Sequence, residues 1–441
     1  MSSFLTNNQG FTANSALFGA DDPNQIYYEV LVSNKNTSST APLPLTYLET
    51  RNSPYLNNPS EYNLTIVRFT LDTPSLPVFI PTMDLTNSGN INPNSSAPQP
   101  TIYSITLTYT DPTSGTLYSG GQTYINWIPE IQQASITPNN TTTVQDNSTP
   151  YYYCYSYQWW IMLCNEAFQN AYNSLQDVVA TAGLQLPSNY APFFVWDSVN
   201  GIATMNADVG SLAGGYLTLS SLYGYTVPTA TLSNVGLNSA TYGQISICFN
   251  SAMYQLFNSF PSIAYGYGSS INFNGTEVLG GNVQIPVFTY AGQNSVSEPL
   301  NPFHTAPETP VYFAQIAQEY STVPMWNPIM GIVFTSSTIP VQPMNVGTPF
   351  VYNGDTLIQT GNNSNISAIV TDFQSSNNDY RGFINYTPTG QYRLIDLFGN
   401  KPLTQLNFTV FWKSRTGQLF PFYLVSGASA QVVFGFFKKA L

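Results

Sequence analysis

Residues 103–110 alternate strictly between large aliphatic or aromatic side chains and the small polar side chains of serine and threonine. The order is Tyr103, Ser104, Ile105, Thr106, Leu107, Thr108, Tyr109 and Thr110. A period of two residues places one set of side chains on each face of a β-strand, so the segment predicts a strand. Similar patterns predict strands at 26–32, 62–71 and 117–127, and prolines limit 76–80 to an edge strand. Residues 34–60, rich in Asn, Ser, Thr and Pro, are expected to form a long loop.

Strand patterns return in the last third of the chain, separated by Asn, Gly and Pro turns. They cover residues 329–335, 366–373, 383–386, 392–397, 406–413, 420–425 and 431–437. Many short strands with turn-rich connections are typical of a β-sandwich. We therefore expect a mainly β protein built on an antiparallel jelly-roll sandwich.

The middle of the chain follows a different period. Apolar residues recur at helical spacing over 157–182, and Gly183 ends the run, which predicts one long helix. Asn200-Gly201, between two apolar segments, predicts a hairpin. Four parts are expected: a flexible N-terminal arm at 1–24, a first part of the jelly roll at 25–149, a helix-containing insertion or second lobe at 150–300, and a second part of the jelly roll at 301–441.

Charged side chains are scarce. They make up 7% of the residues, where soluble proteins average about 25%. Tyrosine and phenylalanine are abundant instead, with 31 and 27 copies. Interface cores share this composition, and a neutral surface lacks the repulsion that keeps monomers apart. The composition favours a structural protein that assembles with copies of itself or other subunits, and the alternative is a secreted or adhesive protein with a polar coat.

Positive charges are unevenly placed along the chain. No lysine or arginine lies between Arg68 and Arg381, and that interval holds sixteen acidic residues. Phosphate recognition relies on cationic side chains. Direct contact with nucleic acid is therefore not expected over residues 69–380. Lys438 and Lys439 form a small patch that could face a packaged genome, although a solvated chain end is the simpler interpretation.

No constellation predicts catalysis. His304 is the single histidine and has no nucleophile motif nearby, and neither a phosphate-binding loop nor a complete dinucleotide motif occurs. The three cysteines, Cys154, Cys164 and Cys248, fit neither a zinc site nor a disulfide framework, and we expect them to be reduced and mostly buried. We predict no catalytic, cofactor-binding or metal-binding residues and expect that the chain is not an enzyme.

One alternative concerns carbohydrate. Aromatic rings beside carboxylates can hold sugars, and paired carboxylates can hydrolyse them. Trp196 beside Asp197, and Trp127 near Glu130, are the candidates. They keep open a receptor- or glycan-binding spike or fibre and, less favoured, a carbohydrate-active enzyme.

The chain shows neither a secretory leader nor an apolar run of membrane-spanning length. Asn-X-Ser/Thr sites occur, but Asn407 falls inside a strand pattern where a glycan would not fit. We expect an intracellular product without glycans and without a membrane span.

Several segments together resemble penton or minor capsid proteins of small double-stranded DNA viruses, such as virophages and polinton-like viruses. The resemblance covers mainly residues 60–80 and 330–441. It is carried by Tyr62-Asn-Leu-Thr-Ile-Val-Arg-Phe-Thr-Leu-Asp-Thr, Leu76-Pro-Val-Phe-Ile-Pro, Ile332-Val-Phe-Thr-Ser, Val370-Thr-Asp-Phe, Tyr386-Thr-Pro-Thr-Gly-Gln-Tyr-Arg, Val410-Phe-Trp-Lys and Ser426-Gly-Ala-Ser-Ala. The resemblance implies a jelly roll, a structural role in the virion, five copies around an icosahedral vertex and major capsid proteins as neighbours.

Overall fold

The computed structural model of the 441-residue chain divides into two compact units. The jelly-roll unit comprises residues 1–77 and 328–441, and the inserted unit comprises residues 78–327. The expected arm at 1–24 lies outside the described residues except for its last two positions. The structure describes residues 23–36, 42–85, 99–111, 113–130, 145–186, 190–208, 244–260, 263–264, 283–285, 295–296, 311–341, 350–353, 356–359, 368–374, 382–387 and 393–439.

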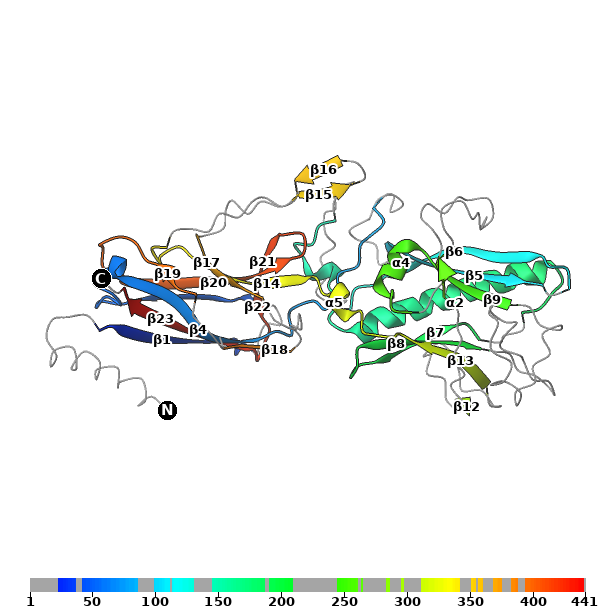
Figure 1. Cartoon of the computed structure of the whole chain (residues 1–441), viewed down its shortest axis with the longest axis horizontal. Helices are drawn as coiled ribbons and strands as arrows, with labels where there is room; N and C mark the ends of the chain where they lie inside the picture. The colour runs from blue at the N-terminus through cyan, green and yellow to red at the C-terminus, as the bar shows by residue number, and fades with distance from the viewer. Residues whose placement is uncertain are drawn as a thin grey trace. The chain divides into compact units, whose positions relative to one another are not determined.

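The jelly-roll unit contains two antiparallel sheets (Figure 1). The first runs in the order β1 (Gln25–Ser33), β23 (Ser429–Lys438), β4 (Tyr62–Asp72) and β18 (Phe383–Tyr386), and β19 (Ile395–Asp396) also pairs with β4. The second runs β17 (Ala368–Phe373), β14 (Ile329–Ser336), β20 (Gln405–Ser414) and β21 (Leu419–Pro421), with β3 (Thr46–Thr50) also on β20. Two short pairs complete the unit: β2 (Leu43–Pro44) with β22 (Tyr423–Leu424), and β15 (Phe350–Asn353) with β16 (Thr356–Gln359).

The strand order identifies the sandwich as a jelly roll. Eight principal strands follow one another along the chain: β1, β3, β4, β14, β17, β18, β20 and β23. Numbered in that sequence, the first sheet has the order 1-8-3-6 and the second 2-7-4-5. Two interleaved Greek keys produce this arrangement. The predicted antiparallel jelly roll is confirmed, and the inserted unit occupies the connection between its third and fourth strands.

Phenylalanines fill the space between the two sheets. Phe69 of β4 lies 5.3 Å from Phe334 of β14, measured between ring centroids. Phe434 of β23 lies 5.5 Å from Phe408 of β20. All four side chains are at most 1% exposed. Their burial removes large apolar areas from water, which is the main force that holds two facing sheets together.

The inserted unit also has two antiparallel sheets. One runs β10 (Ile263–Ala264), β11 (Val283–Ile285), β9 (Gln244–Phe249), β5 (Gln99–Thr110) and β6 (Leu117–Trp127). The other runs β12 (Ser295–Val296), β13 (Val311–Ala317), β8 (Ile202–Asp208) and β7 (Phe193–Asp197). The β7–β8 pair is the hairpin predicted around Asn200-Gly201. Helices are α2 (Tyr157–Thr181), α4 (Ser251–Leu256) and α5 (Val323–Trp326), with 3₁₀ turns η3 (Pro150–Tyr152) here and η2 (Pro59–Glu61) in the jelly-roll unit.

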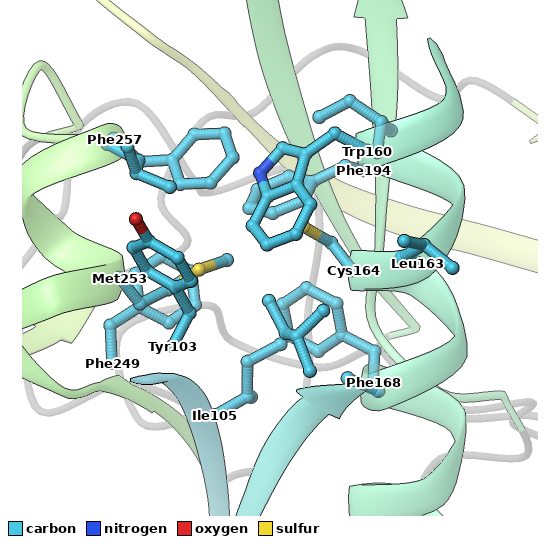
Figure 2. Close-up of a cluster of buried hydrophobic side chains, with 14 of the residues drawn as sticks. Tyr103, Ile105, Trp160, Leu163, Cys164, Phe168, Phe194, Phe249, Met253 and Phe257 are labelled. Carbon is cyan, nitrogen blue, oxygen red and sulfur yellow. The ribbon is translucent and has the colours of Figure 1, made fainter. Parts of the chain in front are cut away.

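Helix α2 runs between these two sheets and contacts β5, β6 and β7 (Figure 1). Phe168 of the helix lies 5.3 Å from Phe194 of β7 and 6.2 Å from Phe249 of β9. Figure 2 shows Trp160, Cys164 and Phe168 directed from the helix into this core. The helix ends at Gly183, whose positive φ of 75° suits a residue without Cβ. The predicted helix at 157–182 is therefore confirmed to within one residue.

The unit boundaries differ from the expected ones. The sequence assigned residues 25–149 and 301–441 to the jelly roll, but β5 and β6 pair with β9, and β13 pairs with β8. These strands therefore belong to the inserted unit, which spans 78–327 instead of 150–300. Alternation predicts that a strand has one buried face, and it does not say which sheet the strand joins.

Two local predictions were wrong. Residues 76–80 form no strand and contribute only an isolated bridge between Phe79 and Cys154, because the flanking prolines lack the N–H groups a ladder needs. The expected loop at 34–60 contains β3, which pairs with β20.

Candidate assembly surfaces

The outer face of the first jelly-roll sheet carries exposed apolar side chains. Alternation along β1 turns Tyr27 and Leu31 toward solvent, where they are 56% and 69% exposed. Tyr27 meets Phe437 of β23 edge to face, with ring centroids 5.8 Å apart. Apolar groups gathered on a sheet face are typical of a surface that a partner covers.

A charged pair crosses the same face. The Arg68 guanidinium lies 3.9 Å from the Glu29 carboxylate, and both side chains are about half exposed. A solvent-exposed pair of this length contributes little to folding stability. Its charges therefore remain available to orient an approaching subunit.

The second sheet offers a comparable outer surface. Leu48 of β3 is 63% exposed and Met330 of β14 is 41% exposed. The outward positions of β20 are half-buried, among them Phe411 and Lys413. Each outer face of the sandwich thus combines exposed apolar side chains with charged ones: Glu29 and Arg68 on the first sheet, and Lys413 on the second.

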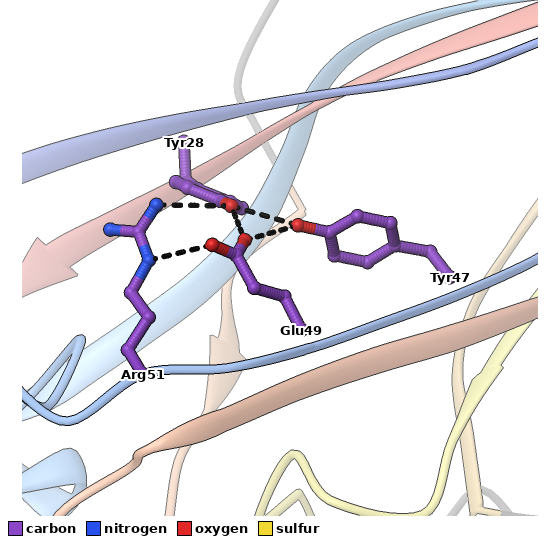
Figure 3. A network of polar contacts seen from close by, with 4 residues as sticks. All are labelled: Tyr28, Tyr47, Glu49 and Arg51. Carbon is purple, nitrogen blue, oxygen red and sulfur yellow. Dashed lines mark hydrogen bonds and ion pairs between the residues drawn. The ribbon is translucent and has the colours of Figure 1, made fainter. Parts of the chain in front are cut away.

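A polar cluster closes the sandwich between its two edge strands, β1 and β3 (Figure 3). The Tyr28 and Tyr47 hydroxyls both donate to one Glu49 oxygen, Oε2. Arg51 donates to the other oxygen, Oε1, over 3.0 Å and stacks on the rings of Tyr28 and Tyr55 at 4.8 and 4.7 Å. Edge strands present unpaired backbone groups, and this cluster ties the two edges to each other.

The Glu49 carboxylate is held in its charged form. Burial by itself would raise its pKa, but the hydrogen bonds from Tyr28, Tyr47 and Arg51 outweigh that effect and lower the pKa to about 2. Burial and the bond to Glu49 raise the pKa of Tyr47. The cluster therefore stays intact across neutral and mildly acidic pH.

The side chain of Asn407, in strand β20, makes hydrogen bonds to neighbouring residues. Its Oδ1 accepts hydrogen bonds from Ser336 Oγ at 2.7 Å and from the Thr338 hydroxyl at 2.9 Å, and its amide donates to Ser337 Oγ at 2.6 Å. The side chain closes the turn that follows β14. The amide and carbonyl of Asn407 are therefore both engaged in hydrogen bonds within the jelly-roll unit.

Lys438 and Lys439, the candidates for contact with a genome, are both paired with acids. Lys438 Nζ lies 3.7 Å from the Glu61 carboxylate, and Lys439 Nζ lies 3.2 Å from that of Asp396. Both lysine side chains are about 30% exposed. Their charge is partly neutralised inside the jelly-roll unit, which weakens attraction to phosphates.

The cysteines are free and buried, as predicted. Burial raises the pKa of all three thiols, that of Cys248 to about 12, so none is a reactive thiolate. Among the described residues no group of three or more His, Cys, Asp or Glu could hold a metal. His304 lies outside the described residues. No described helix is long and apolar enough to cross a membrane.

The four residues suggested for sugar binding do not all lie at one site. Trp127 is fully buried, and its Nε1 donates to the Tyr151 carbonyl at 3.1 Å. Asp197 accepts hydrogen bonds from Val199 and Asn200 in the β7–β8 turn. Trp196 and Glu130, however, line one cleft of about 320 Å³ together with Trp159. Sequence reasoning missed Trp159, because an aromatic ring on an apolar helix is usually part of the core.

Comparison with known proteins agrees with the fold. The family model of the Sputnik minor capsid protein V18/19 matches residues 26–438. The chain belongs to this family. It is accordingly a structural component of a viral capsid, and the expected structural role and virion localisation are confirmed.

Two relatives come from the Sputnik virophage. Protein V18 is 31% identical over 176 residues, which cover 39% of this chain and 92% of V18. Structural protein V19 is 28% identical over 200 residues, which cover 45% of this chain and 83% of V19.

Two solved structures share the fold. A chain of the Sputnik virophage structure determined by cryo-electron microscopy aligns with a TM-score of 0.66 and 24% identity, over 95% of this chain and 99% of that one. The mavirus penton protein aligns with a TM-score of 0.51 and 13% identity, over 95% of this chain and all of that one.

Proposed function

We propose that this chain is the penton protein of an icosahedral capsid, with five copies around each vertex and major capsid proteins as neighbours. It acts without catalytic activity and enters the virion during assembly inside the host cell. The observation that carries the proposal is the exposed apolar surface on both outer faces of the jelly roll. The shared fold of the mavirus penton protein supports it.

The two outer faces suit a closed ring. In a cyclic ring each subunit uses two different surfaces, one toward each neighbour. The first sheet would supply Tyr27 and Leu31 with Glu29, and the second sheet would supply Leu48 with Lys413. Opposite charges on surfaces that meet favour the correct register, and apolar groups supply the affinity.

The proposal predicts a pentamer that depends on Leu31. The purified chain, alone or mixed with its major capsid protein, should form five-membered rings by light scattering and electron microscopy. Leu31→Glu places an unpaired charge in the interface and should weaken ring formation by at least about tenfold.

Val199→Glu is the matched control, because Val199 is 90% exposed at the β7–β8 turn and belongs to the inserted unit, so it is on neither jelly-roll sheet. It should leave the rings intact, and both variants should keep the melting temperature of the wild type. A chain that stays monomeric even with its major capsid protein would refute the penton role. Equal ring formation by the two variants would refute the assignment of this face.

A further inference from the structure

The cleft in the inserted unit has a fixed aromatic wall. Trp196 lies 5.4 Å from Tyr157 and stacks on Trp326 at 5.6 Å, between ring centroids. Trp159 is held by its Nε1, which donates to the Ile128 carbonyl at 2.9 Å. Both Trp159 and Trp196 stay partly exposed to the cleft. Rings that are already locked in place lose little entropy when a ligand stacks on them.

A carboxylate stands in the same cleft. Glu130 Oε2 accepts hydrogen bonds from the Tyr155 and Ser156 backbone N–H groups at 2.6 and 3.2 Å, at the start of α2. These bonds fix the carboxylate and partly compensate its charge. The other oxygen, Oε1, has no hydrogen-bond partner among the described residues, so it is free to accept from a bound molecule.

The remaining polar groups lie beside it. Gln158 is exposed on α2, and its amide can both donate and accept. The Ser156 hydroxyl also lines the cleft and has the same dual capacity. A ligand that carries several hydroxyl groups needs donors and acceptors together, whereas a cationic ligand needs acceptors alone. The mixture favours a polyhydroxylated ligand over an ammonium or guanidinium group.

The electrostatics decide the charge of the ligand. The chain has no lysine or arginine from residue 69 to residue 380, so the inserted unit brings no lysine or arginine side chain to this cleft. A sulfate, phosphate or carboxylate group would face Glu130 without compensation. The cleft is therefore better suited to a neutral sugar than to an acidic one.

We propose that the cleft lined by Glu130, Trp159 and Trp196 binds a neutral saccharide. The apolar face of the sugar ring stacks on a tryptophan, and its hydroxyl groups bond to Glu130, Gln158 and Ser156. The volume of about 320 Å³ lies at the lower end of the range for small-molecule pockets, which fits one or two sugar units at the end of a glycan. The residues that line the cleft all belong to the inserted unit, so the proposal does not rest on the proposed ring.

The test is binding of defined saccharides to the full chain by saturation-transfer difference NMR. The probes are lactose, mannobiose, maltose and N,N′-diacetylchitobiose as neutral sugars, sialyllactose as an acidic sugar, and a trimethyllysine peptide as a cation. At least one neutral disaccharide should bind and sialyllactose should not. Trp159→Ala and Glu130→Gln should each weaken that binding by about tenfold, because each removes one main contact.

Two glutamines on the same helix provide a matched pair. Gln158→Ala should weaken binding several-fold, whereas Gln176→Ala, which is also exposed but does not line the cleft, should leave it unchanged. Circular dichroism checks that every variant is folded. The proposal is overturned if no neutral probe binds, if sialyllactose or the peptide binds more tightly, or if binding persists unchanged in the folded Trp159 and Glu130 variants.

Discussion

Glu49 is one carboxylate on which three neighbouring side chains converge. Tyr28, Tyr47 and Arg51 donate to it, and Arg51 in turn packs on Tyr55. In a chain with only 22 acidic residues, an acid committed to an internal cluster is informative. The sequence did not reveal it, because Tyr47 and Glu49 lie in a segment that resembles a loop, and the partners Tyr28 and Glu49 are 21 residues apart.

The Glu49 cluster makes the stability of the jelly-roll unit sensitive to acid. The pKa of Glu49 is about 2 when folded, against an ordinary value of 4.5. The folded state thus binds this proton less tightly, and the stabilisation is present above about pH 4.5 and is lost as the pH falls toward 2. Urea unfolding midpoints should fall more steeply over that range in the wild type than in Glu49→Gln.

Asp177→Asn is the control for that experiment. It changes the net charge by the same amount, but Asp177 is an exposed residue of α2, far from the cluster in sequence and in the other unit. Between pH 4.5 and pH 2, the urea unfolding midpoint of Asp177→Asn should fall as steeply as that of the wild type. If the unfolding midpoints of the wild type and Glu49→Gln fell equally steeply over this pH range, the role given to Glu49 would be contradicted.

At the scale of elements, α2 shows what sequence pattern can and cannot predict. Its length follows from helical periodicity and from Gly183, so its bounds were predictable. Its position was not, because an apolar stripe does not specify the sheet it packs against. The same holds for β5, whose alternation was read correctly and whose sheet was not. In the cleft, Trp196 and Glu130 could be named from sequence, but only the fold brings Trp159 beside them.

Contact between α2 and β6 depends on Gly120. A Cβ atom there would lie 2.6 Å from the Leu175 nitrogen and 3.0 Å from the Ala171 carbonyl oxygen, both of which are helix backbone. Backbone cannot rotate away as a side chain can, so Gly120→Ala should destabilise the inserted unit by about 1–3 kcal/mol. Chemical denaturation followed by tryptophan fluorescence would measure the loss.

Gly115→Ala separates crowding from backbone strain. Gly115 has a positive φ of 68°, but no atom lies within 4 Å of the place its Cβ would take. We expect the strain alone to cost about 1 kcal/mol. If Gly120→Ala proved no more harmful than Gly115→Ala, the close approach of helix and strand would not matter for stability.

At the scale of the whole molecule, the two units have separate cores. The aromatic cluster around α2 draws its buried members from residues 78–326, all within the inserted unit. The phenylalanines between the jelly-roll sheets come from β4, β14, β20 and β23. The sequence predicted that an insertion interrupts the jelly roll, and it misplaced the boundaries because strands of both units show the same alternation.

Separate cores predict that the jelly roll folds without the insertion. A variant in which a short Gly/Ser linker replaces residues 78–327 should give the circular dichroism spectrum of an antiparallel β protein and one cooperative melting transition. The matched variant carries the same deletion with Phe434→Ala, which should lose about 3–5 kcal/mol through the cavity it leaves. An unfolded deletion variant would show that the sandwich needs its insertion.

The inserted unit leaves and re-enters the jelly roll between the same two consecutive strands, β4 and β14. A change of length or sequence within it therefore shifts no strand register in either jelly-roll sheet. The surfaces of the jelly-roll unit and those of the inserted unit can then evolve at different rates on one polypeptide. Recombination that exchanges the entire 78–327 segment would therefore preserve the jelly-roll sandwich while replacing every surface that the inserted unit presents.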